Sequence, residues 1–180
     1  VDMEAGEHRQ PAYLKLNPSG FVPAMIVDGT PLYESAALVM LLAERHPQAA
    51  LAPPVGSPQH GLYVTWLFHL SNTLQTAFKD WFYPERPAGV DAVEGAKASA
   101  RARIEECWDR IEAHIRSGGP YLIGDRVGAA DFLATMLMRW SRNMPKPATE
   151  WPTLANYVAR MKARPSFKTL YAREGLTEWA

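Results

Sequence analysis

The segment from Asn17 to Ser35 constrains the fold of this chain more than any other part of the sequence. A polar loop leads into Val22-Pro23, and two short apolar runs follow at residues 24–27 and 31–33. The runs are separated by Asp28-Gly29-Thr30, and an Asp-Gly pair between apolar runs is typical of a β-hairpin. Because the second run begins with a proline, which has no N–H to donate, its strand is predicted to lie at a sheet edge.

The hairpin and the helix that follows it are incomplete on their own. Residues 35–44 form a nearly all-apolar run, which is typical of a buried helix that needs a broad apolar partner. Residues 1–3 can form the end of a strand, but a stable sheet needs three or more strands. We therefore expect the chain to lack the first strand and helix of its domain, a unit of about 30 residues that would precede Val1.

Beyond residue 46 the composition changes, and the rest of the chain is predicted to be helical. The proline-rich stretch 47–58 is interpreted as an interdomain linker, and Ser57-Pro58 is a typical helix start. Two domains are therefore predicted, an incomplete α/β domain at residues 1–48 and an all-α domain at residues 57–180. The expected helices of the second domain span residues 58–83, 90–117, 129–142, 152–164 and 166–172.

Two residues of the helical domain invite a functional interpretation, and a structural one is favoured for both. Cys107 is the only cysteine and shares a helix face with apolar residues, so it is predicted to be a core residue rather than a reactive thiol. Asp131 stands at the third position of a helix expected to begin after Gly128. A carboxylate there can accept hydrogen bonds from free backbone N–H groups, so Asp131 is predicted to be structural.

Composition and charge argue against several classes of protein. The 180 residues include 19 Lys and Arg and 19 Asp and Glu, so no basic excess favours nucleic acid. No apolar run reaches membrane-spanning length, and no secretory signal is recognised. A single cysteine allows no internal disulfide, which suits the cytoplasm. No metal site is predicted, because metal-ligand spacing is absent from the histidines, which are His8, His46, His60, His69 and His114.

Two dipeptides of the opening segment form a matched receptor for a small zwitterionic peptide. A cis bond at Val22-Pro23 would turn the Val22 N–H and C=O toward a bound peptide, although the dipeptide alone favours an ordinary trans bond. Glu34-Ser35 opens the next helix, where Ser35 and free N–H groups can bind a carboxylate and Glu34 an ammonium. Alone, Glu34-Ser35 favours a plain helix cap with a solvated Glu. The two dipeptides lie one hairpin apart. Together they indicate a peptide-binding site more specifically than either does alone.

With these residues in view, the chain resembles the bacterial cytosolic glutathione transferases over essentially its whole length. The resemblance implies a thioredoxin-like N-terminal domain, an all-helical C-terminal domain and a homodimer. It also implies that Val22 pairs with the cysteinyl backbone of glutathione beside a cis Pro23, that Glu34 and Ser35 hold the γ-glutamyl group and that His8 contacts the glycyl carboxylate. The matching motifs are Gly6-Glu7-His8, Asn17-Pro18 to Val22-Pro23, Glu34-Ser35, Gly124-Asp125 with Ala130-Asp131, and Arg164-Pro165-Ser166.

The chain departs from the family pattern at two places. The residue that activates the glutathione thiolate is expected upstream of Val1, so no catalytic residue is named. Gly128 stands where the family often has Ser or Thr as a helix cap. The resemblance further implies an electrophile pocket on one helix face that carries Phe68, Asn72 and Gln75. Further apolar surface near it could come from Trp81, Phe82, Tyr83, Trp140, Met144 and Trp179, although each of these singly is more typical of a core or dimer contact.

The expected function is conjugation of glutathione to small hydrophobic electrophiles, in detoxification or catabolism. Isomerisation, dehalogenation, peroxide reduction and disulfide exchange remain open on the same fold. A non-catalytic ligand-binding or protein-interaction module is the alternative from another class, because fold does not fix function. A metal enzyme is a third hypothesis, which the spacing of the histidines disfavours.

Overall fold

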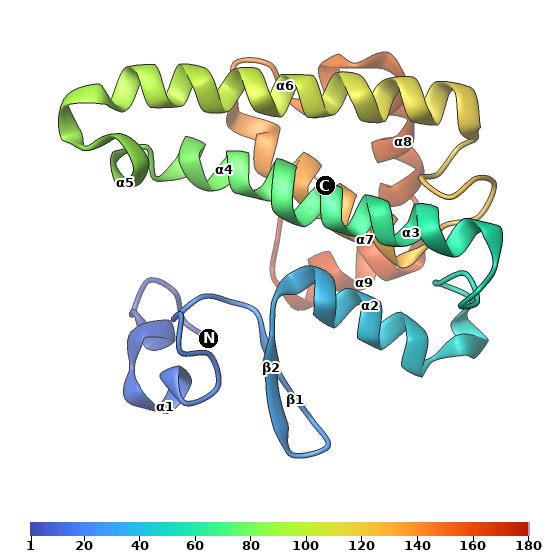
Figure 1. Ribbon diagram of the computed structural model, residues 1–180, viewed down its shortest axis with the longest axis horizontal. Coiled ribbons are helices and arrows are strands. Elements are labelled where there is room, and N and C mark those ends of the chain that lie inside the picture. Colours follow the sequence, from blue (N-terminus) through green and yellow to red (C-terminus); the bar gives the residue numbers. More distant parts are fainter. Residues whose placement is uncertain (180) are drawn as a thin grey trace.

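The computed structural model describes residues 1–179 and separates a small N-terminal part from a larger helical part. In Figure 1 the N-terminal part, drawn in blue, lies below the helices, and its hairpin points away from them. Its elements are a 3-10 turn (Glu7–Arg9), α1 (Pro11–Leu14), β1 (Ala24–Val27), β2 (Thr30–Tyr33) and α2 (Ser35–Arg45).

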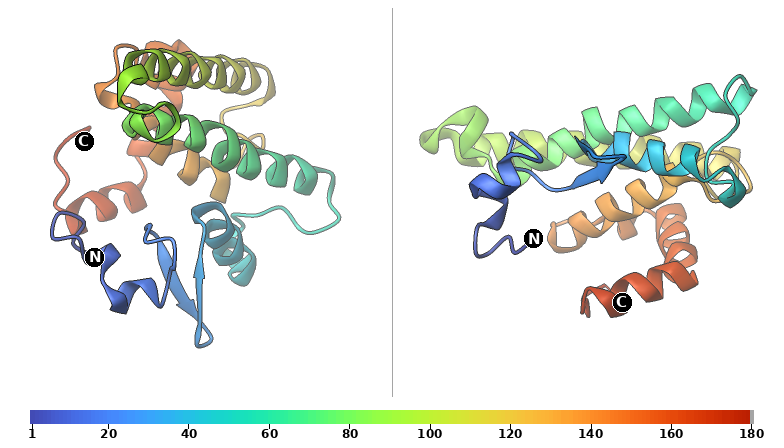
Figure 2. Two further views of the ribbon diagram at one scale, coloured as in Figure 1. Left: turned by 60° about the vertical axis from the view of Figure 1, so that its left-hand side comes forward. Right: turned by 90° about the horizontal axis from the view of Figure 1, so that it is seen from below.

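The helical part begins after the 3-10 turn Pro47–Ala49 and contains two long antiparallel rods, α3 to α4 and α6, that lie side by side (Figures 1 and 2). Helix α7 crosses beneath both rods, and α8 and α9 follow it. The elements are α3 (Pro58–Phe68), a π segment (His69–Leu74), α4 (Gln75–Phe82), α5 (Glu85–Ala88), a 3-10 turn (Val90–Ala92), α6 (Val93–Gly118), α7 (Ala129–Trp140), 3-10 turns Ser141–Asn143 and Ala148–Glu150, α8 (Pro152–Lys162) and α9 (Pro165–Arg173).

The predicted hairpin is confirmed in its turn and in its pairing. Strands β1 and β2 are antiparallel, with Ala24 opposite Tyr33 and Val27 opposite Thr30. Asp28 and Gly29 both have positive φ, at 50° and 80°, which is the requirement of the tight turn that matches strand twist. Within residues 1–179 the sheet has these two strands alone.

Helix α2 is less buried than its apolar sequence predicts. Its buried residues are Leu38 and Ala43, whereas Leu42 is 45% exposed. The helix contacts β2, α3 and α7. The predicted buried helix is therefore buried on one side in the described chain, and Leu42 on another side is half open.

The rod expected at residues 58–83 is one continuous structure, but it is not a regular α-helix throughout. Residues His69–Leu74 form a π segment between α3 and α4. A π turn holds an extra residue, so it shifts the face presented by the residues after it, and Leu70 and Leu74 are both fully buried here. The next predicted helix, at residues 90–117, begins later, at Val93, after a 3-10 turn.

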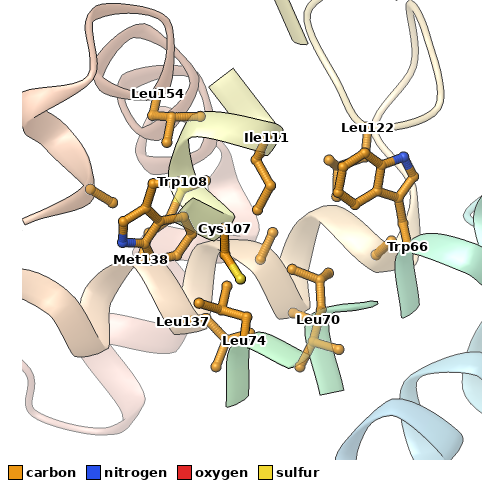
Figure 3. Close-up of a cluster of buried hydrophobic side chains, with 14 of the residues drawn as sticks. Trp66, Leu70, Leu74, Cys107, Trp108, Ile111, Leu122, Leu137, Met138 and Leu154 are labelled. Carbon is orange, nitrogen blue, oxygen red and sulfur yellow. The ribbon is translucent and has the colours of Figure 1, made fainter. Parts of the chain in front are cut away.

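The core of the helical part lies where α6 and α7 face the α3–α4 rod, as Figure 3 shows. Cys107 lies in this core at 4% exposure, and burial raises the pKa of its thiol. The predicted structural role of Cys107 is therefore confirmed. Its labelled neighbours in the cluster are Trp66, Leu70, Leu74, Trp108, Ile111, Leu122, Leu137, Met138 and Leu154.

Several hydrogen bonds hold the start of α7. The fully buried carboxyl of Asp131 accepts hydrogen bonds from the N–H groups of Leu122 and Gly128, at 3.0 and 2.7 Å, and from the Tyr157 hydroxyl at 2.7 Å. Burial raises the pKa of Asp131, and these donors oppose that rise. Asp131 therefore joins the loop before α7 to α8.

Packing at this helix end explains why residue 128 is a glycine. The Ala129 N–H donates to the Leu51 carbonyl in the linker at 2.7 Å. A Cβ on Gly128 would lie 3.2 Å from the same Leu51 oxygen, which is tighter than an ordinary contact. Glycine therefore leaves room for the linker carbonyl, which accepts from the first free N–H of the helix, that of Ala129.

Replacing Asp131 by alanine is expected to lower the free energy of unfolding by about 3 kcal/mol, because buried N–H and O–H donors lose their acceptor. Urea unfolding followed by circular dichroism measures the change. Asp125→Ala is the matched control, since Asp125 is exposed. A loss below about 1 kcal/mol for Asp131→Ala would contradict the structural role.

Candidate functional site

The loop before Val22 is fixed through one carbonyl group. The Phe21 carbonyl accepts hydrogen bonds from the Tyr13 hydroxyl and from Asn17 Nδ2, each at 2.7 Å. Both donors are buried, at 8% and 3% exposure, and burial raises the pKa of Tyr13, so its hydroxyl keeps its proton. Two donors on one carbonyl set the direction of the backbone just before Val22.

The rest of the loop is held by short contacts within the N-terminal part. Asn17 Oδ1 accepts from the Ser19 N–H at 3.0 Å, so the Asn17 side chain bridges both ends of the turn. Gly20 has φ +63°, and a Cβ there would lie 3.2 Å from the His8 carbonyl oxygen. This position therefore needs glycine both for its backbone conformation and for its contact with the turn at His8.

Val22 is the next residue after Phe21, and its N–H and C=O are the groups to which the peptide-binding role was assigned. The Val22-Pro23 bond is cis, as the family resemblance implies; the trans bond favoured by the dipeptide alone is wrong. Val22 is 44% exposed. Within residues 1–179, no hydrogen bond uses its N–H or its C=O, since the ladder of β1 begins at Ala24. An extended peptide could therefore pair with both groups, as an added strand would.

The Glu34-Ser35 pair takes a different local geometry from the one predicted. Helix α2 begins at Ser35, and its flanking residue Glu34 is exposed with φ 78°, an uncommon conformation for a residue with a side chain. The Ser35 hydroxyl does not cap the helix. It donates instead to Gln75 Oε1 at 3.2 Å, at the start of α4. The backbone N–H groups at the start of α2 therefore have no side-chain cap.

The three residues assigned to an electrophile pocket are not equivalent. Gln75 is linked to Ser35, whereas Phe68 is 57% exposed at the end of α3. Asn72 lies in the π segment and accepts a hydrogen bond from the Ser71 hydroxyl at 3.1 Å. The π segment separates Phe68 from Gln75, so the regular α-helical spacing on which their common face was predicted is interrupted.

His8 lies in the 3-10 turn before α1 and is buried at 8% exposure. Its Nδ1 has no hydrogen-bond partner among the residues that the structure describes. A buried ring nitrogen without a partner is uncommon in folded proteins. The His8 carbonyl oxygen lies close to Gly20, because a Cβ added to Gly20 would stand 3.2 Å from it.

Among the residues expected to be mostly core or dimer contacts, two aromatic side chains at the end of α4 are open: Phe82, and Tyr83 at 44% exposure. Phe78, Phe82 and Trp140 have ring centroids 5.8–6.0 Å apart; Phe78 is fully buried, but Phe82 is 48% exposed. On the same helix, Lys79 Nζ lies 5.4 Å from the ring centre of Phe21. This cation–π contact joins the loop before Val22 to α4.

Within residues 1–179 no three His, Cys, Asp or Glu side chains gather as ligands for a metal ion. No helix in this part of the chain has the length and apolar character to cross a membrane.

The sequence matches two families along most of its length. Residues 1–45 match the glutathione S-transferase N-terminal domain, and residues 67–160 match the glutathione S-transferase C-terminal domain. The chain belongs to the glutathione S-transferase family. The family is one of transferase enzymes, and the described fold is its thioredoxin-like N-terminal domain followed by a helical C-terminal domain.

Named relatives agree with this glutathione S-transferase assignment. Glutathione S-transferase GstA of Escherichia coli O157:H7 is 28% identical over 165 residues, 91% of this chain and 79% of the relative. Maleylacetoacetate isomerase of Pseudomonas aeruginosa is 29% identical over 180 aligned positions, 92% of this chain and 77% of the relative.

Solved structures of other glutathione transferases share the fold. A glutathione transferase of Methylococcus capsulatus superposes with a TM-score of 0.83 at 30% identity, over 92% of this chain and 79% of that one. A homologue from Sulfitobacter, solved with bound glutathione, has a TM-score of 0.88 at 26% identity, over 98% of this chain and 85% of that one.

Neither Tyr13 nor Asn17 of this glutathione S-transferase was assigned a role from the sequence, yet both hold the loop before Val22.

Tyr13→Phe removes one of the two donors to the Phe21 carbonyl. It is expected to lower the free energy of local opening of residues 17–22 by about 1 kcal/mol, so that their amides exchange about fivefold faster. Amide hydrogen exchange of these residues measures the effect. Tyr33→Phe is the control, because Tyr33 is 40% exposed on the hairpin. Equal exchange in both variants would contradict the positioning role of Tyr13.

Proposed function

We propose that this glutathione S-transferase binds glutathione at the loop 17–23 and the start of α2, and joins its sulfur to small hydrophobic electrophiles. The observation that carries the proposal is the exposed, unpaired peptide of Val22 beside cis Pro23, which is held in place through the Phe21 carbonyl. Val22 would exchange backbone hydrogen bonds with the cysteinyl residue of glutathione.

The remaining residues supply a complementary group for each end of the tripeptide. The uncapped N–H groups at the start of α2 and the Ser35 hydroxyl would bind the carboxylate of the γ-glutamyl group, as helix N-termini bind anions. Exposed Glu34 would bind its ammonium. The single O–H of Ser35, which donates to Gln75 Oε1 in this structure, would turn to the carboxylate when glutathione binds. His8 would approach the glycyl carboxylate.

The chemistry follows from the thiol of glutathione. An ordinary cysteine pKa is about 8.5, so bound glutathione must be stabilised as the thiolate to react well near neutral pH. The thiolate forms a carbon–sulfur bond to the electrophile, and either a leaving group departs with its bonding electrons or a proton completes an addition. No residue of the described chain is assigned the stabilising role.

The electrophile is proposed to lie against the α3–α4 rod. Phe68, Asn72 and Gln75 are the proposed contacts, and the open ring of Phe82 adds apolar surface beside them. We further propose a homodimer that acts in the cytoplasm in detoxification or catabolism.

A second function, glutathione-dependent isomerisation, is favoured by one observation. One relative, 29% identical, is named maleylacetoacetate isomerase. An isomerase would add glutathione to a double bond and release it again, so glutathione would be needed but not consumed.

One experiment separates these functions. Glutathione binding is measured by calorimetry, and turnover is measured with aryl halides, enones, epoxides and maleylacetoacetate. Conjugate formation with consumption of glutathione supports the transferase, and isomerisation without consumption supports the isomerase. Binding without turnover, together with no downward shift in the thiol pKa of bound glutathione, would support a non-catalytic binding protein. Absence of binding would overturn the proposal.

Ser35→Ala is expected to weaken glutathione binding by about 1–2 kcal/mol, the scale of a hydrogen bond to a charged group. Calorimetric titration with glutathione measures the loss. Ser117→Ala is the control, because Ser117 is an exposed serine near the end of α6 that bonds within its own helix. An unchanged affinity in Ser35→Ala would show that the hydroxyl serves only to hold Gln75.

A further inference from the structure

Two cationic side chains, Lys79 and Arg86, converge on the ring of Phe21, the residue before Val22. Lys79 Nζ lies 5.4 Å from the centre of this ring, and the guanidinium carbon of Arg86 lies 6.0 Å from it. Arg86 also stacks on Tyr83, with its guanidinium carbon 4.1 Å from that ring centre. A cation over an aromatic face is held by the ring but keeps its charge. The loop that carries Val22 is therefore bordered by two positive charges of α4 and α5.

Neither charge is neutralised by an ion pair within residues 1–179. Asp80, the acid next to Lys79, pairs with Arg103 at 2.6 Å. Glu85, the acid next to Arg86, is exposed and forms no ion pair in the described part of the chain. Two like charges beside one ring raise each other's energy, so an anion placed between them would be stabilised by both.

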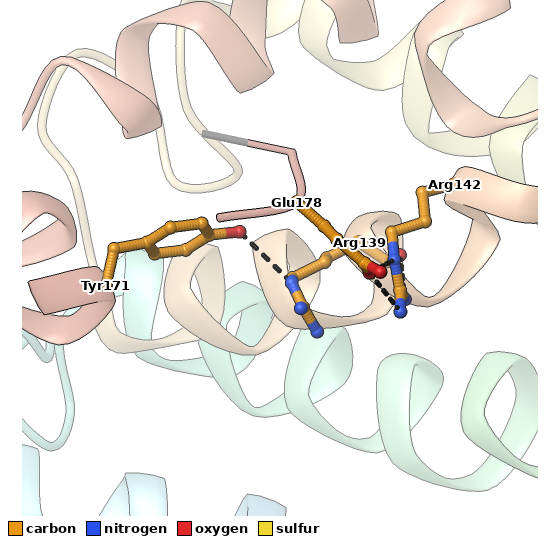
Figure 4. A network of polar contacts seen from close by, with 4 residues as sticks. All are labelled: Arg139, Arg142, Tyr171 and Glu178. Atoms are coloured by element: carbon orange, nitrogen blue, oxygen red, sulfur yellow. Dashed lines mark hydrogen bonds and ion pairs between the residues drawn. The ribbon is translucent and has the colours of Figure 1, made fainter. Parts of the chain in front are cut away.

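Arg86 keeps its N–H donors unused, in contrast to two arginines of α7 and the turn after it. Arg139 also lies over a tyrosine ring, but its Nε donates to the hydroxyl of the same Tyr171 at 3.0 Å, and Arg142 pairs with Glu178 at 2.9 Å (Figure 4). The Arg86 side chain has ring contacts alone among the described residues. A guanidinium that stacks by its face keeps its donors in the plane, where they match the two oxygens of a carboxylate.

We propose that Lys79 and Arg86 bind a carboxylate of the electrophile, so that the enzyme prefers electrophiles that carry a negative charge. This inference rests on the proposed function, in which the sulfur of glutathione is held beside Val22, the residue after Phe21. Phe82 and Tyr83 follow Lys79 by three and four residues, so they share its side of the helix. They are 48% and 44% exposed and offer apolar surface to the rest of such an electrophile.

The segment expected upstream of Val1 would border this face, and the proposed reaction requires that it leave the face open. Its strand would pair along β1, which begins at Ala24, on the other side of cis Pro23 from Phe21. The residue that activates the thiolate is expected in the same segment, and an electrophile has to reach that thiolate. Access to Lys79 is therefore a consequence of the proposal that an experiment can measure.

The first test compares 3,5-dinitrobenzoate with its neutral amide, titrated into the whole protein saturated with glutathione. The acid is expected to bind at least about tenfold more tightly than the amide at low salt, because only the acid forms charge-assisted hydrogen bonds with both cations. Lys79→Met and Arg86→Gln should each lower the acid-to-amide affinity ratio about fivefold. High salt should lower this ratio in the unmodified protein, since exposed charges are screened.

Lys146→Met is the matched control for the loss of a lysine that lies over an aromatic ring. Lys146 Nζ lies 3.9 Å from the ring centre of Trp151, and neither residue belongs to the proposed site. The acid-to-amide ratio should be the same in this variant as in the unmodified protein.

The second test measures access to Lys79 by reductive methylation and peptide mass analysis of the glutathione-saturated protein. Lys79 should be methylated, and 3,5-dinitrobenzoate should protect it whereas the amide should not. Lys146 should be methylated equally with either compound.

Three results would each overturn the proposal: equal affinity for acid and amide, a ratio unchanged in both variants, or a Lys79 that stays unmethylated. Weaker glutathione binding in Lys79→Met and Arg86→Gln with an unchanged ratio would assign the cations to a carboxylate of glutathione instead, and would also overturn it. Titration of glutathione alone tests the proposed function separately. Absence of binding there overturns both, whereas normal binding with an unchanged acid-to-amide ratio overturns this inference alone.

Discussion

The buried carboxyl of Asp131 is the interaction on which the arrangement of the helical part depends. It joins the loop before α7 to α8 through Leu122 and Tyr157, while the linker carbonyl of Leu51 accepts from the first N–H of the same helix. Helix α7 in turn contacts α2, α3 and α8. Because a buried acceptor cannot leave its donors without a large cost, this helix end fixes the position of the elements around it.

The candidate glutathione site uses contacts between segments far apart in sequence. Ser35 reaches Gln75 across the two parts of the chain, and Phe21 lies against Lys79 on the same helix. These contacts place the loop 17–23 and the start of α2 against α4. Contacts of Tyr13 and Asn17 within the N-terminal part therefore fix the loop itself, and the packing of this part on the helical part sets where the loop and Ser35 lie relative to α4.

Local patterns made the hairpin, the helical domain and the structural role of Cys107 predictable from sequence. Each depends on neighbouring residues or on the apolar spacing of one helix. The π segment was missed because a single extra residue in a turn leaves the apolar pattern nearly unchanged. The bond from Tyr13 to Phe21 and the bond from Ser35 to Gln75 depend on tertiary packing, so no local signal could assign them. The cis bond at Val22-Pro23 followed from the family resemblance alone, because the dipeptide favours trans.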